Sequence, residues 1–245
     1  MCQQLFSCVF FDWDLTLAYT ISDVSSPEER LTAIFQTAGF PYSLPEVEEA
    51  FRKYNESVKN GQLKRNGDKN TQEEIMQFYK DILVKLEHLD PDSVSMNVLY
   101  NAYANLDVNL YDDTLPLFRK LKENNIKLGI ITNHSKYIRH EIEKRLGKFI
   151  QPEHIIISQE VGEHKPSETI FKLACNQLKI SPEKCVFVGN DLYVDAIGAV
   201  VAGEYGMGIW LNRHSNAEEV PNLPERVFCI RSLHEVPRYL FSLDK

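Results

Sequence analysis

The chain has 245 residues, of which 43% are hydrophobic and 25% charged, and this composition excludes a disordered or collagen-like protein. Its length allows one or two domains and a core that is stable without disulfide or metal crosslinks. The formal net charge of −8 argues against a nucleic-acid partner, which would need a basic face. No apolar run approaches the roughly 18 to 20 residues of a membrane span, so we expect no membrane partner.

The five cysteines are scattered, and they form neither a CxxC pair nor a zinc-binding spacing with histidine. Cys8 and Cys185 lie inside apolar runs and are expected to be small core residues. The N-terminal segment has no basic stretch ahead of its apolar run, so it does not resemble a signal peptide. We therefore predict a cytoplasmic protein in a reducing compartment. The sequence does not indicate an oligomeric state.

The first predicted strand, Phe6–Phe11, is followed by a long segment with helical patterns and no convincing strand. Two short sequences in this segment, Ser26–Glu29 and Thr71–Glu74, match the capping box that starts a helix. We predict a helical insertion over residues 18–107, which separates residues 1–17 from residues 108–245.

After the insertion, short apolar runs alternate with helical patterns. The runs are near-continuous, as expected for parallel strands buried on both faces. They are Leu128–Thr132, Ile155–Ser158, Cys185–Gly189, Met207–Leu211 and Val227–Ile230. The helical patterns are Thr114–Asn124, Lys136–Leu146, Ser167–Leu178 and Leu192–Ala202. This alternation predicts an α/β fold with a doubly wound parallel sheet, which binds ligands at the carboxyl ends of its strands.

Two carboxylates, Asp12 and Asp14, directly follow the first predicted strand. Residues i and i+2 of an extended chain face the same side, and carboxylates this close repel unless a cation bridges them or one is protonated. The pair fits a nucleophile and a general acid/base beside a divalent metal ion. A solvated turn is the alternative, and the pair alone does not decide between the two.

Three further segments carry polar residues at predicted strand ends. Thr132 and Asn133 could bind phosphate oxygens, and Lys165 could neutralise a phosphate while holding a carboxylate in place. The segment from Gly189 to Asp195 leads through a glycine turn into a helix that begins with acidic residues. Each segment taken alone also has a structural explanation, namely a helix start, a solvated lysine, or acids favoured by the helix dipole.

Together, these four segments closely resemble the motifs of the haloacid dehalogenase-like (HAD) hydrolase superfamily, in their order and spacing. The resemblance covers the whole chain. It implies a Rossmann-like doubly wound core over residues 1–17 and 108–245 and a separate α-helical cap domain over residues 18–107.

The resemblance also implies the roles of individual residues. Asp12 matches the nucleophile that attacks a phosphoryl group and forms an aspartyl-phosphate, and Asp14 matches the general acid/base. Thr132 matches the phosphate-contacting hydroxyl, with Asn133 beside it. Lys165 matches the lysine that balances the charge of the nucleophile and the phosphate.

The metal implied by the resemblance is Mg²⁺, bound by Asp12, Asp14 and an acid of the 189–195 segment. Many relatives have Asp directly after the glycine of this segment, whereas this chain has Asn190. We choose Asp191 as the third metal residue, with Asn190 and Asp195 as close competitors.

Two other positions depart from the pattern of the superfamily. Leu15 stands where relatives usually have glycine, so the turn after the nucleophile is expected to differ slightly. His134 stands where relatives often have a small residue.

The expected function is a Mg²⁺-dependent phosphatase, a phosphoric monoester hydrolase that acts on a small phosphorylated metabolite. Asp14 argues against the dehalogenase and phosphonatase branches, which lack the second acid. A phosphomutase of the β-phosphoglucomutase kind retains both acids and stays an alternative. The second alternative is a noncatalytic regulatory protein on the same scaffold. The substrate and the cap residues that select it are not predicted.

Overall fold

In the computed structural model of the protein, the described residues are 5–20, 26–64, 72–91, 94, 98–99, 101–102, 108–136, 138–213 and 222–241. The chain divides into two compact units. One, the α/β unit, contains Met1–Tyr19 and Leu110–Lys245, and the other, the helical unit, contains Thr20–Asn109. Within the described ranges, no helix has the length and apolar character needed to cross a membrane.

Six strands of the described α/β unit form one parallel sheet, in the order β5-β4-β1-β6-β7-β8. The strands are β1 (Cys8–Phe11), β4 (Lys127–Thr132), β5 (Ile155–Ile157), β6 (Cys185–Gly189), β7 (Met207–Leu211) and β8 (Val227–Ile230). The predicted doubly wound parallel sheet is therefore confirmed. Because the strand order reverses at β1, the carboxyl ends of β1, β4 and β6 border the crevice in which such sheets bind ligands.

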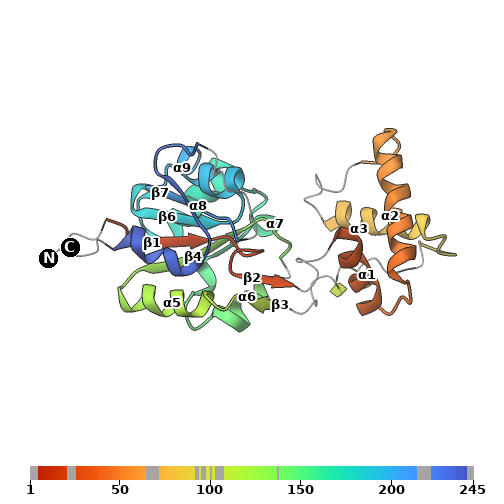
Figure 1. Ribbon diagram of the computed structural model, residues 1–245, viewed down its shortest axis with the longest axis horizontal. Helices are drawn as coiled ribbons and strands as arrows, with labels where there is room; N and C mark the ends of the chain where they lie inside the picture. Colours follow the sequence, from red (N-terminus) through yellow and green to blue (C-terminus); the bar gives the residue numbers. More distant parts are fainter. Residues whose placement is uncertain are drawn as a thin grey trace. The chain divides into compact units, whose positions relative to one another are not determined.

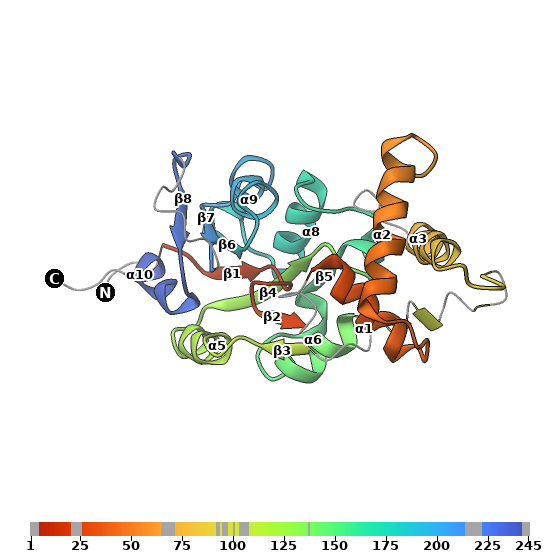
Figure 2. The same ribbon diagram turned by 45° about the vertical axis from the view of Figure 1, so that its right-hand side comes forward.

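Helices cover both faces of this sheet (Figures 1 and 2). On one side lie α8 (Glu168–Leu178) and α9 (Gly198–Val201), and on the other lie α5 (Thr114–Glu123) and α6 (Ile138–Leu146). Strand β1 packs on both sides, since the ring of Phe10 lies 5.6 Å from that of Tyr205 and the ring of Phe11 lies 5.1 Å from that of Phe118. This double burial explains the uninterrupted apolar character of the strand.

Short helices complete the α/β unit. They are η3 (Pro152–His154), α7 (Ser158–Val161), η4 (Pro182–Lys184), η5 (Leu192–Ile197), η6 (Leu233–Glu235) and α10 (Pro237–Leu240). The predicted helix Leu192–Ala202 is divided between the π-helical turn η5 and the α-helix α9. This local change of helical pitch lies directly after the end of β6, where the fourth predicted motif is found.

The helical unit contains α1 (Pro27–Thr37), α2 (Leu44–Lys59) and α3 (Gln72–Lys85). The predicted capping box at the start of α1 is present, because Ser26 Oγ accepts from the Glu29 N–H and the Glu29 carboxylate accepts from the Ser26 N–H. Thr71, the predicted start of α3, lies outside the described residues. Aromatic side chains such as Phe35, Tyr54 and Phe78 form a separate core in this unit.

Two short strands, β2 (Ala18–Thr20) and β3 (Val108–Leu110), pair where the chain passes between the two units. Just before β2, the Leu17 carbonyl oxygen accepts from the Tyr111 N–H at 3.1 Å and from Thr114 Oγ1 at 2.8 Å. The departing and returning segments are therefore fastened to each other directly after the Asp12 segment.

A buried ion pair anchors the same region of the α/β unit. Arg213 donates to both carboxylate oxygens of Asp113 at 2.8 Å, and it also donates to the Thr16 carbonyl oxygen at 2.9 Å. Asp113 accepts further hydrogen bonds from Ser232 Oγ and the Leu233 N–H. Burial raises the pKa of Asp113, but Arg213 and these hydrogen bonds outweigh burial and hold the pKa below its usual value.

We expect Asp113→Ala to lower the free energy of unfolding by about 3–5 kcal/mol, because it leaves the Arg213 guanidinium buried without its counterion. Chemical denaturation at pH 7 measures this loss. The control is Glu168→Ala, which removes the exposed partner of Lys172 and should cost at most about 1 kcal/mol. Similar losses for both variants would contradict an anchoring role for the buried pair.

Candidate active site

Asp12 lies one residue beyond β1, and its backbone continues the sheet, since its N–H donates to the Val188 carbonyl oxygen at 2.9 Å. Its side chain is buried, and Thr16 Oγ1 donates to Asp12 Oδ2 at 3.2 Å. The intervening turn places Leu15 at a φ of 57°, in the left-handed region. This conformation costs a residue with a Cβ about 1–2 kcal/mol, so glycine, which the resemblance to the superfamily leads us to expect here, would adopt it more readily than Leu15.

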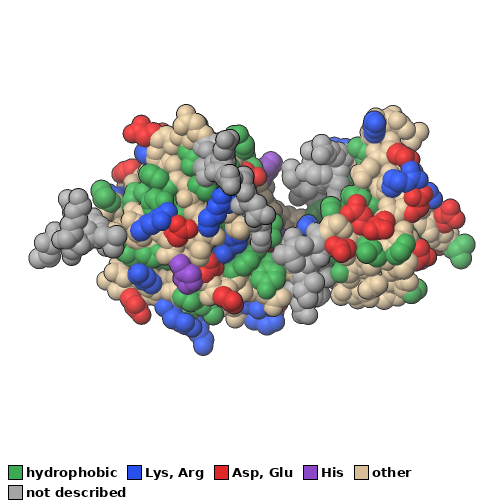
Figure 3. Space-filling model, in the orientation of Figure 1, with side chains coloured by type: hydrophobic (Ala, Val, Ile, Leu, Met, Phe, Trp, Pro, Cys, Tyr) green, Lys and Arg blue, Asp and Glu red, His purple; other side chains and the backbone are tan. Residues whose placement is uncertain are grey.

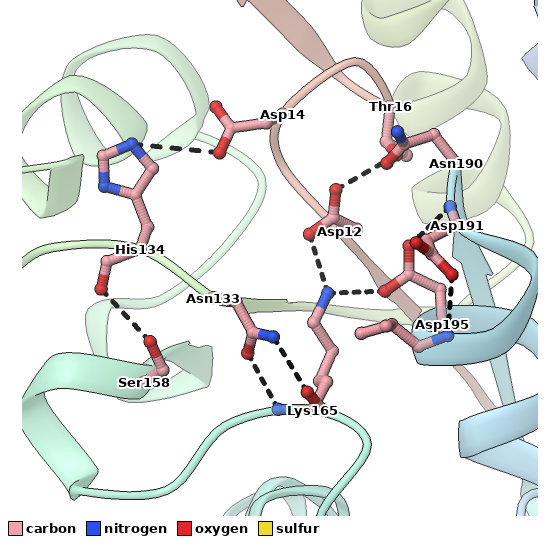
Figure 4. A network of polar contacts seen from close by, with 11 residues as sticks. Asp12, Asp14, Thr16, Asn133, His134, Ser158, Lys165, Asn190, Asp191 and Asp195 are labelled. Carbon is pink, nitrogen blue, oxygen red and sulfur yellow. Dashed lines mark hydrogen bonds and ion pairs between the residues drawn. The ribbon is translucent and has the colours of Figure 1, made fainter. Parts of the chain in front are cut away.

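The central feature of the site is an ammonium group held between two buried carboxylates (Figure 4). Lys165 Nζ lies 2.7 Å from Asp12 Oδ1 and 2.7 Å from Asp195 Oδ1. All three side chains are buried. Ion pairs at these distances in a desolvated site fix the positions of all three groups.

The pKa values in this cluster reflect burial opposed by charge. Burial raises the pKa of Asp195 to about 6 and also raises the pKa of Asp12, although Lys165 opposes both shifts. Asp14 adds to the rise at Asp12 through charge repulsion. Burial alone would lower the pKa of Lys165, but the two carboxylates outweigh it and raise the pKa above its usual value. One ammonium among these acids leaves excess negative charge, which a further cation would stabilise.

Asp195 is positioned from the turn after β6. Its Oδ2 accepts from the Asp191 N–H at 3.0 Å, and the turn approaches so closely that a Cβ at Gly189 would lie 2.3 Å from that oxygen. Only glycine leaves space for this carboxylate. Asp191 itself is exposed, and its Oδ1 accepts from the N–H groups of Tyr193 and Val194 at 2.8 Å. The Asp191 side chain therefore caps η5.

Asn133 and Lys165 form a reciprocal pair. The Asn133 amide donates to the Lys165 carbonyl oxygen at 2.9 Å, and the Lys165 N–H donates to Asn133 Oδ1 at 2.8 Å. Asn133 thus holds the backbone that carries the ammonium. Thr132, at the end of β4, is fully buried, and its Oγ1 has no hydrogen-bond partner among the described residues. A buried hydroxyl without a partner is uncommon, because most buried polar groups are hydrogen-bonded.

Oxygen atoms of three residues converge on the side chain of Asn190. One terminal atom of its amide lies 3.3 Å from Asp12 Oδ2, 3.0 Å from the Asp14 carbonyl oxygen and 3.3 Å from Thr16 Oγ1. By contrast, no three His, Cys, Asp or Glu side chains converge as a metal site within the part of the chain that the structure describes. The carboxylates of Asp12, Asp14 and Asp191 accordingly do not form such a cluster.

The Asp14 side chain points away from this oxygen cluster and toward His134 (Figure 4). It is 41% exposed, and its Oδ2 lies 3.8 Å from His134 Nε2. His134 is held in turn by Ser158, whose Oγ donates to its carbonyl oxygen at 3.2 Å. The Asp14 carboxylate is therefore accessible, whereas that of Asp12 is buried.

The structure thus brings Asp12 and Lys165 into direct contact, and it places Asp12 Oδ2 and the carbonyl oxygen of Asp14 around the same end of the Asn190 amide. Sequence reasoning missed Thr16, although its position two residues beyond Asp14 continues the alternation of that segment. It also missed the partnership of Asn133 with the Lys165 backbone, for which the sequence carries no local signal.

Known proteins share both the sequence pattern and the fold. Residues 6–203 match the haloacid dehalogenase-like hydrolase family, so the chain is a hydrolase enzyme of this α/β class. It belongs to the haloacid dehalogenase-like family, and the expected membership is confirmed.

Two curated relatives and one solved structure illustrate this membership. The glyceraldehyde 3-phosphate phosphatase of Methanopyrus kandleri is 29% identical over 219 residues, which cover 87% of this chain and 88% of that protein. The N-acylneuraminate-9-phosphatase of Mus musculus is 28% identical over 135 residues, covering 55% of this chain and 53% of that protein. The HAD-hydrolase YfnB from Bacillus subtilis, bound to magnesium, has a similar fold, with a TM-score of 0.68 at 18% identity over 96% of this chain and 98% of its own.

We expect Lys165→Met to lower the free energy of unfolding by about 3–5 kcal/mol at pH 8, because two buried carboxylates then lack their counterion. Without the ammonium, the folded-state pKa values of Asp12 and Asp195 exceed their unfolded values. The variant therefore loses stability as pH rises and regains it as pH falls. Denaturation at pH 8 and pH 5 measures the difference.

Lys172→Met is the matched control for this experiment, since Lys172 of α8 pairs only with the exposed acids Glu168 and Glu204 among the described residues. It should cost at most about 1 kcal/mol at either pH. An effect of Lys165→Met that does not change between the two pH values would show that the carboxylates are not its source.

Proposed function

We propose that the protein is a Mg²⁺-dependent phosphatase that hydrolyses a small phosphorylated metabolite through an aspartyl-phosphate on Asp12. The observation that carries the proposal is the position of Asp12. Its Oδ1 contacts the Lys165 ammonium, and the neighbouring strand β4 ends at Thr132, whose hydroxyl has no partner among the residues that the structure describes. These are a nucleophile, a positive charge and a hydrogen-bond donor, which together suit a phosphoryl group. The phosphatase names of the two curated relatives support the same chemistry.

The residues around Asp12 suit a magnesium ion. Asp12 Oδ2, the Asp14 carbonyl oxygen and the Asn190 amide provide converging oxygen groups, and Mg²⁺ prefers oxygen ligands. When bound there, the ion would neutralise charge on the phosphoryl group. The ordered contacts of Asp12 with Lys165 at Oδ1 and with Thr16 at Oδ2 keep the carboxylate in a single orientation.

In the proposed reaction, Asp12 attacks the phosphorus atom in line with the ester oxygen. The bond from phosphorus to the ester oxygen breaks, and Asp14 donates a proton to the departing alcohol. Asp14 then takes a proton from a water molecule, which attacks the aspartyl-phosphate and releases phosphate from Asp12. The ammonium of Lys165 has three N–H donors, and within the described part of the chain Asp12 and Asp195 accept from two of them. We assign the third to a phosphate oxygen.

The substrate proposed is a phosphorylated sugar or related small metabolite, as in the names of the curated relatives. We propose that the helical unit acts as the cap that selects it. Basic and acidic side chains are interspersed over the visible face of the α/β unit (Figure 3), so that face has no basic stripe of the kind that binds nucleic acid. The unpaired thiols of Cys8, Cys175, Cys185 and Cys229 support a cytoplasmic location.

The deciding experiment is a screen of phosphorylated metabolites that includes glyceraldehyde 3-phosphate and N-acylneuraminate 9-phosphate. We expect release of inorganic phosphate with Mg²⁺ and none in EDTA. Asp12→Asn should reduce the rate by roughly three orders of magnitude or more, because an amide is a poor nucleophile. Asp112→Asn, which changes an exposed carboxylate of the same unit, should keep wild-type activity.

Each alternative function has its own signature in this screen. Phosphorus NMR that shows an isomeric sugar phosphate in place of free phosphate would identify a phosphomutase. No turnover of any compound, together with no acid-stable phosphorylation of Asp12 in intact-protein mass spectra, would identify a noncatalytic protein.

Thr132→Val separates a phosphate-binding role from a structural one. The hydroxyl has no partner among the described residues, so its replacement by a methyl group should leave the melting temperature unchanged or raise it. A hydrogen bond to a charged phosphate contributes about 1.5–3 kcal/mol, so kcat/KM should fall roughly 10- to 100-fold. Unchanged kcat/KM would show that Thr132 does not contact the substrate.

A further inference from the structure

The side-chain amide of Asn190 can face the Asp12 carboxylate with either its NH₂ group or its oxygen, and the two orientations have different effects on the site. Its backbone is fixed, because the carbonyl oxygen of Asn190 accepts from Trp210 Nε1 at 3.0 Å. The terminal atom of its amide that faces inward lies within 3.3 Å of Asp12 Oδ2 and 3.0 Å of the Asp14 carbonyl oxygen. Rotation of the amide by half a turn exchanges nitrogen and oxygen at this point without moving any other atom.

With the nitrogen inward, the amide donates hydrogen bonds to Asp12 Oδ2 and to the Asp14 carbonyl oxygen. These bonds satisfy two acceptors in the absence of a cation. With the oxygen inward, the amide accepts from Thr16 Oγ1 at 3.3 Å, but it also faces Asp12 Oδ2 and the Asp14 carbonyl oxygen with no donor between them. A cation among these oxygens would stabilise this arrangement. The same side chain therefore fits both the metal-free and the metal-bound state of the site.

We propose that Asn190 is a reversible magnesium ligand that takes the place of the ion when the ion is absent. This inference rests on the proposed magnesium site and adds to it the means by which the site is emptied and filled. The NH₂ group holds Asp12 and the Asp14 carbonyl together in the metal-free protein. With Mg²⁺ bound, Asn190 would hold the ion through Oδ1 instead.

Charge explains what the amide does that a carboxylate could not. Asp12 and Asp195 carry two negative charges, and Lys165 neutralises one of them. A carboxylate at position 190 would add a negative charge about 3 Å from Asp12, which would destabilise the metal-free protein and strengthen the attraction for Mg²⁺. The neutral amide thus stabilises the empty site and weakens metal binding, so occupancy follows the free Mg²⁺ concentration.

The test measures Mg²⁺ binding by calorimetry and thermal unfolding in EDTA and in Mg²⁺, with no substrate. We expect Asn190→Asp to melt below the wild type in EDTA, to gain more from Mg²⁺, and to bind Mg²⁺ about tenfold more tightly or better. Asn176→Asp makes the same chemical change on the exposed face of α8 and should alter neither quantity. Asp191→Asn should change the Mg²⁺ affinity less than twofold.

A second measurement does not depend on whether Asn190→Asp folds in EDTA. In wild-type protein labelled with ¹⁵N at asparagine, the side-chain NH₂ signals that are missing from Asn190→Ala belong to Asn190. We expect those signals to shift on titration with Mg²⁺ while the other asparagine signals stay in place.

Three results would overturn the inference: an Asn190 signal that does not respond to Mg²⁺, an affinity unchanged by Asn190→Asp, or loss of Mg²⁺ binding in Asp191→Asn. The outcome is separate from that of the phosphatase screen. Mg²⁺ binding through Asn190 without phosphate release would refute the phosphatase alone, and a phosphatase whose Mg²⁺ affinity is unchanged by Asn190→Asp would refute this inference alone.

Discussion

The buried ammonium of Lys165 is the group on which the arrangement of the site depends. It contacts two carboxylates from separate parts of the chain, Asp12 directly after β1 and Asp195 in η5. Without a cation between them, these two buried acids would repel each other or become protonated. Other features of the site follow from this requirement. Asn133 holds the backbone of Lys165, and Gly189 leaves the space that the Asp195 carboxylate fills.

The same constraint gives the two oxygens of Asp12 different surroundings. Oδ1 meets a full positive charge, whereas Oδ2 meets the hydroxyl of Thr16 and the amide of Asn190. A carboxylate with both oxygens in identical surroundings would have no preferred reacting atom. Here the asymmetry exists in the protein before any ligand binds, which is what electrostatic preorganisation requires.

The sequence allowed the sheet to be predicted because most of its strands are buried on both faces and are therefore nearly continuous in apolar residues. It also indicated which polar residues follow those strands. It could not show how they meet, since Lys165 is separated from Asp12 by 153 residues along the chain. The choice between Asn190 and Asp191 illustrates the limit. An acidic side chain is the more usual metal ligand, which favoured Asp191 in the sequence. In the structure, however, the turn after β6 directs Asp191 to cap η5 and directs Asn190 toward Asp12.

The hydrogen bonds from Tyr111 and Thr114 to the Leu17 carbonyl oxygen have a consequence for the evolution of such a protein. The segment that leaves the α/β unit and the segment that returns to it are joined at a point that belongs wholly to that unit. The entropic cost of closing a loop grows slowly with its length. The stability of the α/β unit therefore depends little on the number of residues between the two segments. Insertions of different size and fold can therefore be exchanged at this point, while Asp12 keeps its place beside Lys165.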